Sequence, residues 1–258
     1  MASLRDIGAE AAAAIMAVYK STFDVEVKDD RTPLTEADLA AHRAIVAALS
    51  TMTPSIPILS EESADIPFAE RSQWETYWLV DPLDGTREFI KRNGEFTVNI
   101  ALIHQHNPVM GMIWVPVTSV CYEAGVGLGA WKSTSDEARD AITVRSRPTD
   151  VTMVAGSRSH GSDATRAFVE RLGATEMLAI GSSLKSCLVA EGKVDIYPRF
   201  GLTSEWDTAA AQCIVEQAGG RVTDVSLQRL QYNTKDSLLN PDFLVFGDSG
   251  VDWKQFLQ

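Results

Sequence analysis

Apolar residues recur at helical spacing at the start of the chain and at strand spacing soon after. The first pattern predicts helices over residues 3–20 and 36–49. Short apolar runs then predict strands over residues 77–80, 96–103 and 107–117. In the middle strand, FTVNIALI, apolar side chains lie on one face, and the polar side chains of the run lie on the other.

The pattern changes near residue 145, after which strands alternate with helices. The predicted strands cover residues 152–157, 175–180, 194–198, 221–224 and 243–247. The predicted helices cover residues 163–172, 183–191 and 208–218. We therefore expect an α/β (α+β) protein with an antiparallel-sheet lobe over residues 1–145, an α/β lobe over residues 146–258, and a ligand site between them.

Composition and charge narrow the class of protein. Of the 258 residues, 45% are hydrophobic and 22% are charged, which is typical of a globular protein. The net charge of -12 argues against a nucleic-acid partner, because phosphate backbones are held by clustered Lys and Arg. Three widely spaced cysteines predict reduced, buried thiols rather than disulfides or a zinc site. No run reaches the about 20 apolar residues of a membrane span.

The sequence LVDPLDGTREF, residues 79–89, places two carboxylates three positions apart at the end of a strand. Pro82 is expected to end the strand pairing, and Gly85 to permit a tight turn into a helix that starts at TREFIKR. Asp81 and Asp84 would then face one point, where they repel each other unless one is protonated or a cation lies between them. Oxygen ligands of this kind favour Mg²⁺ over zinc.

The same turn is also a candidate anion site. The backbone N–H groups of Gly85, Thr86 and Arg87 would point out of a helix N-terminus, where a phosphate is favoured. An isolated Asp-x-x-Asp turn is nevertheless more often a helix cap than a metal site.

Three further acidic segments lie at predicted element ends. ILSEES places Glu61 after a short strand, EWDTAAAQ places Asp207 at the expected N-cap of a helix, and LTEADLAAH places Asp38 three residues after Thr35. Each of these alone reads as a cap or a solvated loop. Capping does not explain why four element ends are built around carboxylates.

Together these segments resemble the lithium-sensitive, magnesium-dependent phosphatases of the inositol monophosphatase superfamily. The resemblance rests on ILSEES, WLVDPLDGTREFIKRNGEFTVNIALI and EWDTAAAQCIVEQAGG in this order, and it covers nearly the whole chain. It implies a layered αβαβα sandwich of the inositol monophosphatase/fructose-1,6-bisphosphatase type. Within the superfamily the chain is most similar to the bacterial CysQ branch, the 3'(2'),5'-bisphosphate nucleotidases.

The resemblance also implies roles for individual residues. Two or three Mg²⁺ ions would be held by Glu61, Asp81, the Leu83 carbonyl, Asp84 and Asp207. The pair Asp38 and Thr86 would orient and deprotonate the attacking water.

The residues implied to contact the substrate are identified from shorter sequence segments that resemble those of the branch. GSRSH supplies His160, GSSLK supplies Ser182 and Lys185, and YPRF supplies Arg199. Lys185 and Arg199 would attract a 5'-phosphate, although a lone His or a helical Lys is usually a surface residue. The implied substrate contacts are Glu61, Asp84, Gly85, Thr86, Arg87, His160, Ser182, Lys185, Arg199 and Asp207. Arg87 stands where the branch usually has Lys, which bears on fine specificity.

The expected activity is Mg²⁺-dependent, Li⁺-inhibited hydrolysis of adenosine 3',5'-bisphosphate to AMP, extending to 3'-phosphoadenylyl sulfate. One alternative is the same chemistry on inositol monophosphate, fructose 1,6-bisphosphate or histidinol phosphate. It is disfavoured because the TNF.H..P segment typical of inositol enzymes is missing after the DGT turn. Another alternative is a non-catalytic metal-binding or nucleotide-binding protein. We expect a cytoplasmic monomer or homodimer that binds a small phosphorylated nucleotide. Peripheral inner-membrane association, described for some relatives, is the alternative location.

Overall fold

The computed structural model describes most of the chain. The described residues are 2–20, 26–27, 33–34, 36–134, 138–147, 150–157 and 162–257. Two residues singled out by the sequence, Thr35 and His160, lie outside these ranges.

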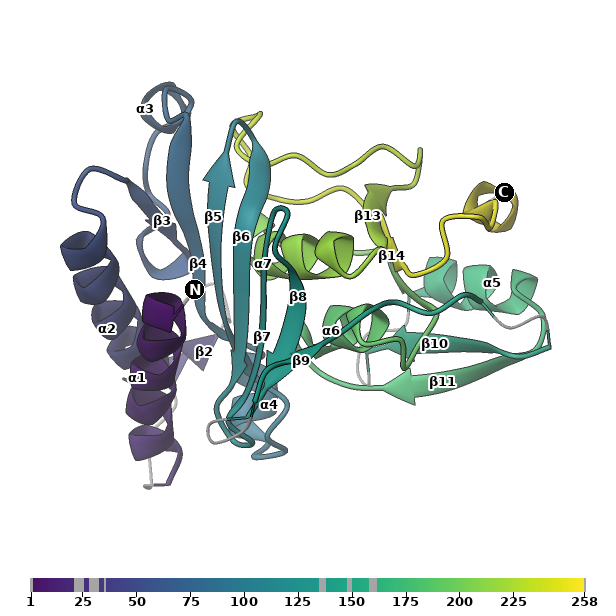
Figure 1. Cartoon of the computed structure of the whole chain (residues 1–258), viewed down its shortest axis with the longest axis horizontal. Helices are drawn as coiled ribbons and strands as arrows, with labels where there is room; N and C mark the ends of the chain where they lie inside the picture. Colours follow the sequence, from purple (N-terminus) through teal and green to yellow (C-terminus); the bar gives the residue numbers. More distant parts are fainter. Residues whose placement is uncertain are drawn as a thin grey trace.

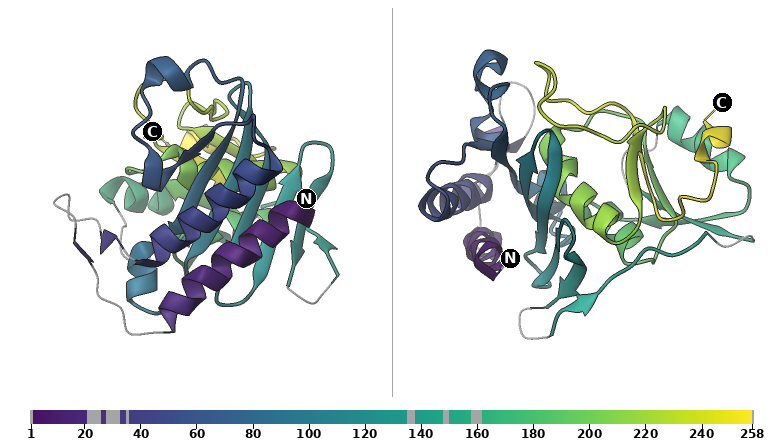
Figure 2. Two further views of the ribbon diagram at one scale, coloured as in Figure 1. Left: turned by 90° about the vertical axis from the view of Figure 1, so that its left-hand side faces the viewer. Right: turned by 45° about the horizontal axis from the view of Figure 1, so that its top comes forward.

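Two long helices form the outermost layer on the N-terminal side. Helices α1 (Ala2–Tyr19) and α2 (Glu36–Met52) lie side by side across one face of a large sheet (Figure 1; Figure 2, left). Both helices turn apolar side chains such as Ile15 and Ile45 toward that face. A short strand pair, β1 (Glu26–Val27) and β2 (Pro33–Leu34), lies between them in the sequence.

Within the described ranges, the large sheet contains seven strands in sequence order. Its strands are β3 (Ile58–Ser60), β4 (Thr76–Asp84), β5 (Thr97–His104), β6 (Asn107–Val115), β7 (Val120–Gly125), β8 (Gly129–Ser133) and β9 (Asp140–Ala141). The pair β3 and β4 is parallel, and each following pair is antiparallel. Three short helical segments flank β4 in the sequence, namely η1 (Glu61–Ser63), α3 (Phe68–Arg71) and α4 (Thr86–Ile90).

Two helices cover the other face of this sheet and separate it from a second sheet. Helix α7 (Glu205–Gln217) packs on strands β5, β6 and β7, and α6 (Leu184–Ala190) packs against α7 and the second sheet. The second sheet has the order β11 (Thr175–Ala179), β10 (Thr152–Gly156), β12 (Ile196–Arg199), β14 (Phe243–Phe246), β13 (Arg221–Asp224). Helix α5 (Asp163–Arg171) and the 3-10 helix η2 (Trp253–Phe256) lie beyond it (Figure 1).

Three hydrophobic clusters hold these layers together. The first lies between the two long helices and the large sheet, and includes Val98 and Ile100 on β5. The second fills the space around α6 and α7, and the third lies between the second sheet and α5. On β14, Val245 belongs to the second cluster and Leu244 to the third, as expected when successive side chains point to opposite faces of a strand. The layer order α, β, α, β, α confirms the predicted fold class.

The second cluster crosses the predicted boundary between the lobes. It contains Leu59 and Ile113 from the first part of the chain together with Val189 and Val245 from the second. The two predicted lobes, residues 1–145 and 146–258, thus share one hydrophobic cluster. The boundary between them stays a prediction.

Several local predictions were confirmed and others were wrong. The cysteines are free and buried, as expected. Strand pairing does not end at Pro82 but continues to Asp84 through a shift of register. Strands β7, β8 and β9 were not predicted. Among the described helices, none is long and apolar enough to cross a membrane.

Candidate active site

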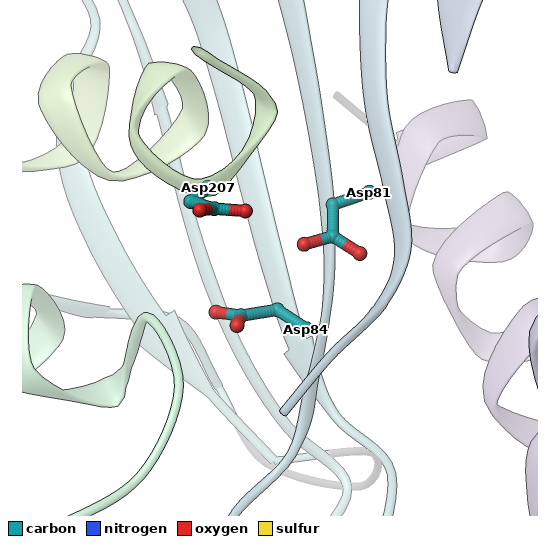
Figure 3. Close-up of side chains that lie close together, drawn as sticks. All are labelled: Asp81, Asp84 and Asp207. Carbon is teal, nitrogen blue, oxygen red and sulfur yellow. The ribbon is translucent and has the colours of Figure 1, made fainter. Parts of the chain in front are cut away.

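An irregularity in β4 brings two carboxylates onto the same face of the large sheet. Asp81 pairs with Asn99 and Asp84 pairs with Thr97, so three steps on β4 lie opposite two steps on β5. Such a bulge changes which face the following side chains occupy. Between the two aspartates, Leu83 turns its side chain into the cluster under the long helices. Both carboxylates consequently face α7 rather than the long helices (Figure 3).

A third carboxylate reaches the same point from the first turn of α7. Oxygen atoms of Asp81, Asp84 and Asp207 all lie within 4.8 Å of one another. Figure 3 shows the three side chains converging from β4 and from the start of α7. Among the described residues, this set is the group of carboxylates placed to hold a metal ion. Three of the predicted metal ligands are thus brought together.

Asp81 occupies the middle of the acidic cluster and is 1% exposed. Its Oδ1 accepts a hydrogen bond of 3.0 Å from the Leu83 N–H, and its carboxyl group also hydrogen-bonds those of Glu61 and Asp207. Burial first, and then repulsion by Glu61 and Asp84, raise the pKa of Asp81 well above its usual range. Without a cation, the cluster therefore retains protons that exposed carboxyl groups would lose.

The pKa values of Glu61 and Asp207 are raised for the same reasons. Burial, followed by repulsion from Asp84, raises the pKa of Asp207 to about 8, against the lowering effect of the Ser204 N–H. Burial, followed by repulsion from Asp38, raises the pKa of Glu61 to about 7. Glu61 is the solvent-exposed member of the cluster, so water screens part of this repulsion.

The position of Asp207 in its helix differs from the prediction. Helix α7 begins at Glu205, and Ser204 is its N-cap, so Asp207 lies at the third helical position. The two residues form a capping box, in which the Ser204 N–H donates to Asp207 Oδ2 at 2.8 Å. The sequence contains two good capping residues three positions apart, and the reciprocal pair uses both. The second oxygen of Asp207 is left to face the other carboxylates.

The predicted catalytic pair comes from two different elements. Asp38 lies in the first turn of α2, is 4% exposed, and is close enough to repel the carboxylates of Glu61 and Asp81. Thr86 begins α4 at the edge of a cavity. Asp38 is therefore adjacent to the acidic cluster in space, and Thr86 is adjacent to it along the chain.

Gly85 makes the turn from β4 into α4 sterically feasible. It adopts a left-handed conformation with φ of 93°, and a Cβ atom at this position would lie 3.2 Å from the Glu95 carbonyl oxygen. The turn presents Thr86 and Arg87 to the cavity. The predicted glycine requirement at this position is confirmed.

A cavity of about 780 Å³ extends from the acidic cluster between the two parts of the chain. Most of the predicted substrate contacts line it, namely Asp84, Gly85, Thr86, Arg87, Ser182, Lys185, Arg199 and Asp207. Glu61 does not line this cavity, and His160 lies outside the described residues. The remaining lining side chains include Tyr197, Phe200 and Leu202, which sequence reasoning did not single out.

Two cationic side chains lie on the side of the cavity formed by the second part of the chain. Lys185 is 7% exposed, and its Nζ donates to the Ser182 carbonyl at 2.6 Å and lies 5.3 Å from the ring centre of Tyr197. Burial lowers the pKa of Lys185, an effect that nearby carboxylates such as Asp84 oppose. Arg199 donates to the Leu202 carbonyl at 2.9 Å. Its Nε is buried and has no hydrogen-bond partner among the described residues.

Sequence reasoning also missed Ser183, which contacts Asp84 directly. The Ser183 N–H and hydroxyl donate to Asp84 Oδ2 at 2.6 and 2.7 Å. Asn99 in turn donates to the Ser183 hydroxyl at 2.9 Å. The polar face predicted for the FTVNIALI strand was the one available signal, because it places Thr97 and Asn99 toward this site.

Comparison with known proteins places these features in context. The model of the family described as the inositol monophosphatase family matches residues 2–246. The 3'(2'),5'-bisphosphate nucleotidase CysQ of Salmonella typhimurium is 51% identical over 236 residues, covering 90% of this chain and 93% of that protein. The crystal structure of CysQ from Bacteroides thetaiotaomicron superposes with a TM-score of 0.84 at 41% identity, covering 95% and 96% of the two chains. The structure of an inositol monophosphatase from Zymomonas mobilis superposes with a TM-score of 0.78 at 25% identity, covering 98% of this chain and 93% of that one.

Proposed function

The chain belongs to the inositol monophosphatase family, and from this premise we propose that it is a Mg²⁺-dependent 3'(2'),5'-bisphosphate nucleotidase. Its substrate would be adenosine 3',5'-bisphosphate, which it would hydrolyse to AMP and phosphate. The observation that carries the proposal is the distribution of charge along one cavity. Asp84 and Asp207 line this cavity together with Lys185 and Arg199.

A cavity lined by both carboxylates and cationic side chains suits a substrate with two phosphate groups. A phosphate near the carboxylates needs a cation between them, because like charges repel. A second phosphate would be attracted by the cationic side chains of Lys185 and Arg199, which both line the cavity. A ligand with a single phosphate would leave Lys185 and Arg199 without an anion. The name of the Salmonella typhimurium relative, a bisphosphate nucleotidase, supports a nucleotide rather than a sugar bisphosphate.

The acidic cluster fits Mg²⁺ by the chemistry of its donors. All of its side-chain donors are carboxylate oxygens, from Asp81, Asp84, Asp207 and Glu61, with the Leu83 carbonyl as a further candidate. Hard oxygen donors are the ligands that Mg²⁺ prefers. When bound, Mg²⁺ would lower the pKa of water and neutralise charge on the phosphoryl oxygens. We expect two or three ions, and inhibition by Li⁺.

The protein's own groups would supply the proton transfer. Asp38, buried at the start of α2, would accept the proton of the attacking water through the Thr86 hydroxyl. The water oxygen forms a bond to phosphorus as the bond from phosphorus to the ribose 3'-oxygen breaks. That oxygen takes up a proton from a solvent water molecule, and Asp38 later returns its proton to solvent. The turn N–H groups at Gly85 and Thr86 would orient the transferred phosphoryl group.

The remaining assignments follow from the lining of the cavity. Ser182 and Arg87 lie at its wall, where they would contact the ribose and phosphate groups. His160 is proposed on the same side of the substrate from its position in the sequence. We propose a cytoplasmic enzyme that acts as a monomer or homodimer.

The test compares substrates with the purified, metal-stripped protein. Phosphate release from adenosine 3',5'-bisphosphate and from inositol 1-phosphate is measured side by side after Mg²⁺ is added back, and then with Li⁺. The proposal requires Mg²⁺-dependent, Li⁺-inhibited release that is faster from the nucleotide. Faster release from inositol 1-phosphate would retain the metal site and overturn the substrate. Mg²⁺ binding without release from either substrate would favour a non-catalytic binding protein.

A further inference from the structure

Asp84 is held by a side chain from the other part of the chain. Its Oδ2 accepts two short hydrogen bonds, one from the Ser183 N–H at 2.6 Å and one from the Ser183 hydroxyl at 2.7 Å. Longer contacts of 3.5 Å come from Thr97 Oγ1 and Asn99 Nδ2. A carboxylate oxygen has two lone pairs, so the two short bonds saturate Oδ2. The other oxygen of Asp84 is the one left for a cation.

Ser183 also contacts the backbone of Asp207, the third aspartate of the cluster. Its hydroxyl lies 3.0 Å from the backbone carbonyl oxygen of Asp207. A serine hydroxyl has a single hydrogen, which can point to Asp84 or to this carbonyl, and the shorter distance is to Asp84. Ser183 therefore lies between two residues that come from β4 and α7.

Asn99 fixes the orientation of the Ser183 hydroxyl. Its Nδ2 donates to Ser183 Oγ at 2.9 Å, so the hydroxyl hydrogen must point elsewhere, toward Asp84 or Asp207. Both Asn99 and Ser183 are buried, with exposed fractions of 1% and 5%. Little of either side chain is accessible to solvent, so the orientation is set by the protein.

The backbone before Ser183 is fastened to the first part of the chain at a second point. The Gly181 N–H donates to Glu95 Oε2 at 2.9 Å. A Cβ atom on Gly181 would lie 2.6 Å from Cγ of Glu88 and 2.8 Å from the Glu95 carbonyl oxygen, so this close approach requires glycine. The segment from Gly181 to Ser183 is thus held at both ends by carboxylates of the first part of the chain.

We propose that Ser183 is a positioning residue for the metal centre. Its hydroxyl orients Asp84, so that the carboxylates from β4 and α7 present their oxygens to one cation. Outer partners of metal ligands typically contribute 10–100-fold to metal affinity or activity. The proposal rests on the proposed function for its metal but not for its substrate.

The test measures Mg²⁺ binding by calorimetry on metal-stripped protein, together with the melting temperature. In Ser183→Ala the N–H contact remains and only the hydroxyl is lost. We expect the dissociation constant for Mg²⁺ to rise about 10-fold, while KM for the nucleotide at saturating Mg²⁺ stays within about twofold. Ser133→Ala is the matched control, because Ser133 is also buried and its hydroxyl has no partner among the described residues.

A double-mutant cycle separates positioning from general packing. Asn99→Ala is expected to weaken Mg²⁺ binding about fivefold, as for the loss of one hydrogen bond. Combined with Ser183→Ala it should add little, because the short contact of Asn99 is with the Ser183 hydroxyl and its contact with Asp84 is long, at 3.5 Å.

The proposal is overturned if Ser183→Ala lowers the melting temperature but leaves the Mg²⁺ dissociation constant within twofold of the unsubstituted protein. Independent, multiplying effects in the double variant would also overturn it. Absence of Mg²⁺ binding by the unsubstituted protein would contradict the metal centre itself. Failure to release phosphate from the nucleotide, with these binding results intact, would count against the proposed substrate alone.

Discussion

The Nζ atom of Lys185 donates a hydrogen bond of 2.6 Å to the carbonyl oxygen of Ser182, one turn back along the chain. This contact keeps a buried ammonium group at the wall of the cavity that also contains Asp84. A charge buried in this way is costly unless it is paired. We interpret it as the group that binds the second phosphate of the substrate.

Lys185→Met tests this interpretation, because Met occupies a similar volume without the charge. We expect KM for adenosine 3',5'-bisphosphate to rise about 10–100-fold, the loss of one hydrogen bond to a charged group. Hydrolysis of adenosine 3'-monophosphate, which has no 5'-phosphate, should change by less than about threefold. Lys193→Met is the control, because Lys193 is exposed and pairs with Glu191. Equal losses on both nucleotides would contradict the assignment.

Asp84→Asn should separate activity from stability. Asparagine keeps an acceptor for the two Ser183 donors and removes one of the charges that repel Glu61 and Asp207. Phosphate release should fall by about 100-fold or more, since even outer partners of metal ligands contribute 10–100-fold. In chelator at pH 8 the melting temperature should rise by about 2–4 °C.

Asp140→Asn provides the control for this change, because Asp140 is exposed on β9 and far from the cluster in the sheet order. It should alter neither the rate of phosphate release nor the melting temperature in chelator. Wild-type phosphate release by Asp84→Asn would show that the acidic cluster is not the catalytic metal site.

Stability of the metal-free protein should depend on pH in a direction set by the raised pKa values. The pKa of Asp207 is about 8 and that of Glu61 is about 7, whereas both are near 4 in an unfolded chain. The folded protein therefore binds more protons between these values, and its stability falls as pH rises from about 4 to about 8. Thermal unfolding in chelator at several pH values measures this slope.

Adding Mg²⁺ separates the contribution of the acidic cluster to this pH dependence from that of other groups. A bound cation should abolish the part of the stability change with pH that is due to Glu61, Asp81 and Asp207. It should leave the part due to Glu205, whose pKa burial raises to about 7 and which accepts from the Asn233 N–H instead. A slope that is identical with and without Mg²⁺ would argue against a cation among the three aspartates.

Gly85→Ala should damage the site through the backbone. The left-handed conformation costs a residue with a Cβ atom about 1–2 kcal/mol, and the new atom would also press on the Glu95 carbonyl. Gly127→Ala is the matched control, because Gly127 has φ of 77° and a Cβ atom there would meet no described atom within 4 Å. Both variants should lose stability in urea unfolding, and only Gly85→Ala should also lose activity.

The local parts of the site could be predicted because each is encoded by adjacent residues. Asp81, Asp84 and Gly85 lie within one turn, and the alternation of β5 places Thr97 and Asn99 on the face of the site. The continuation of β4 past Pro82 could not be predicted, since a bulge leaves the proline outside the regular pairing. The predicted N-cap position of Asp207 was wrong, because Ser204 caps α7 three residues earlier.

Contacts between distant segments could not be predicted from the sequence. Ser183 binds Asp84 only because α6 packs between the two sheets, and the sequence indicated only that Ser183 begins a helix. Strand β7 was missed because it contains Glu123, a charged residue that is buried there as the partner of Arg139. Such pairings depend on the completed fold.

The most direct measurement identifies the product of the reaction. Metal-stripped protein is given Mg²⁺ and adenosine 3',5'-bisphosphate, and phosphorus NMR follows the two phosphate signals. Loss of the 3'-phosphate with formation of adenosine 5'-monophosphate and inorganic phosphate is expected, with no reaction in chelator. Formation of adenosine 3'-monophosphate, or release that proceeds without a divalent cation, would contradict the assignment of the acidic cluster as the site of 3'-phosphate hydrolysis.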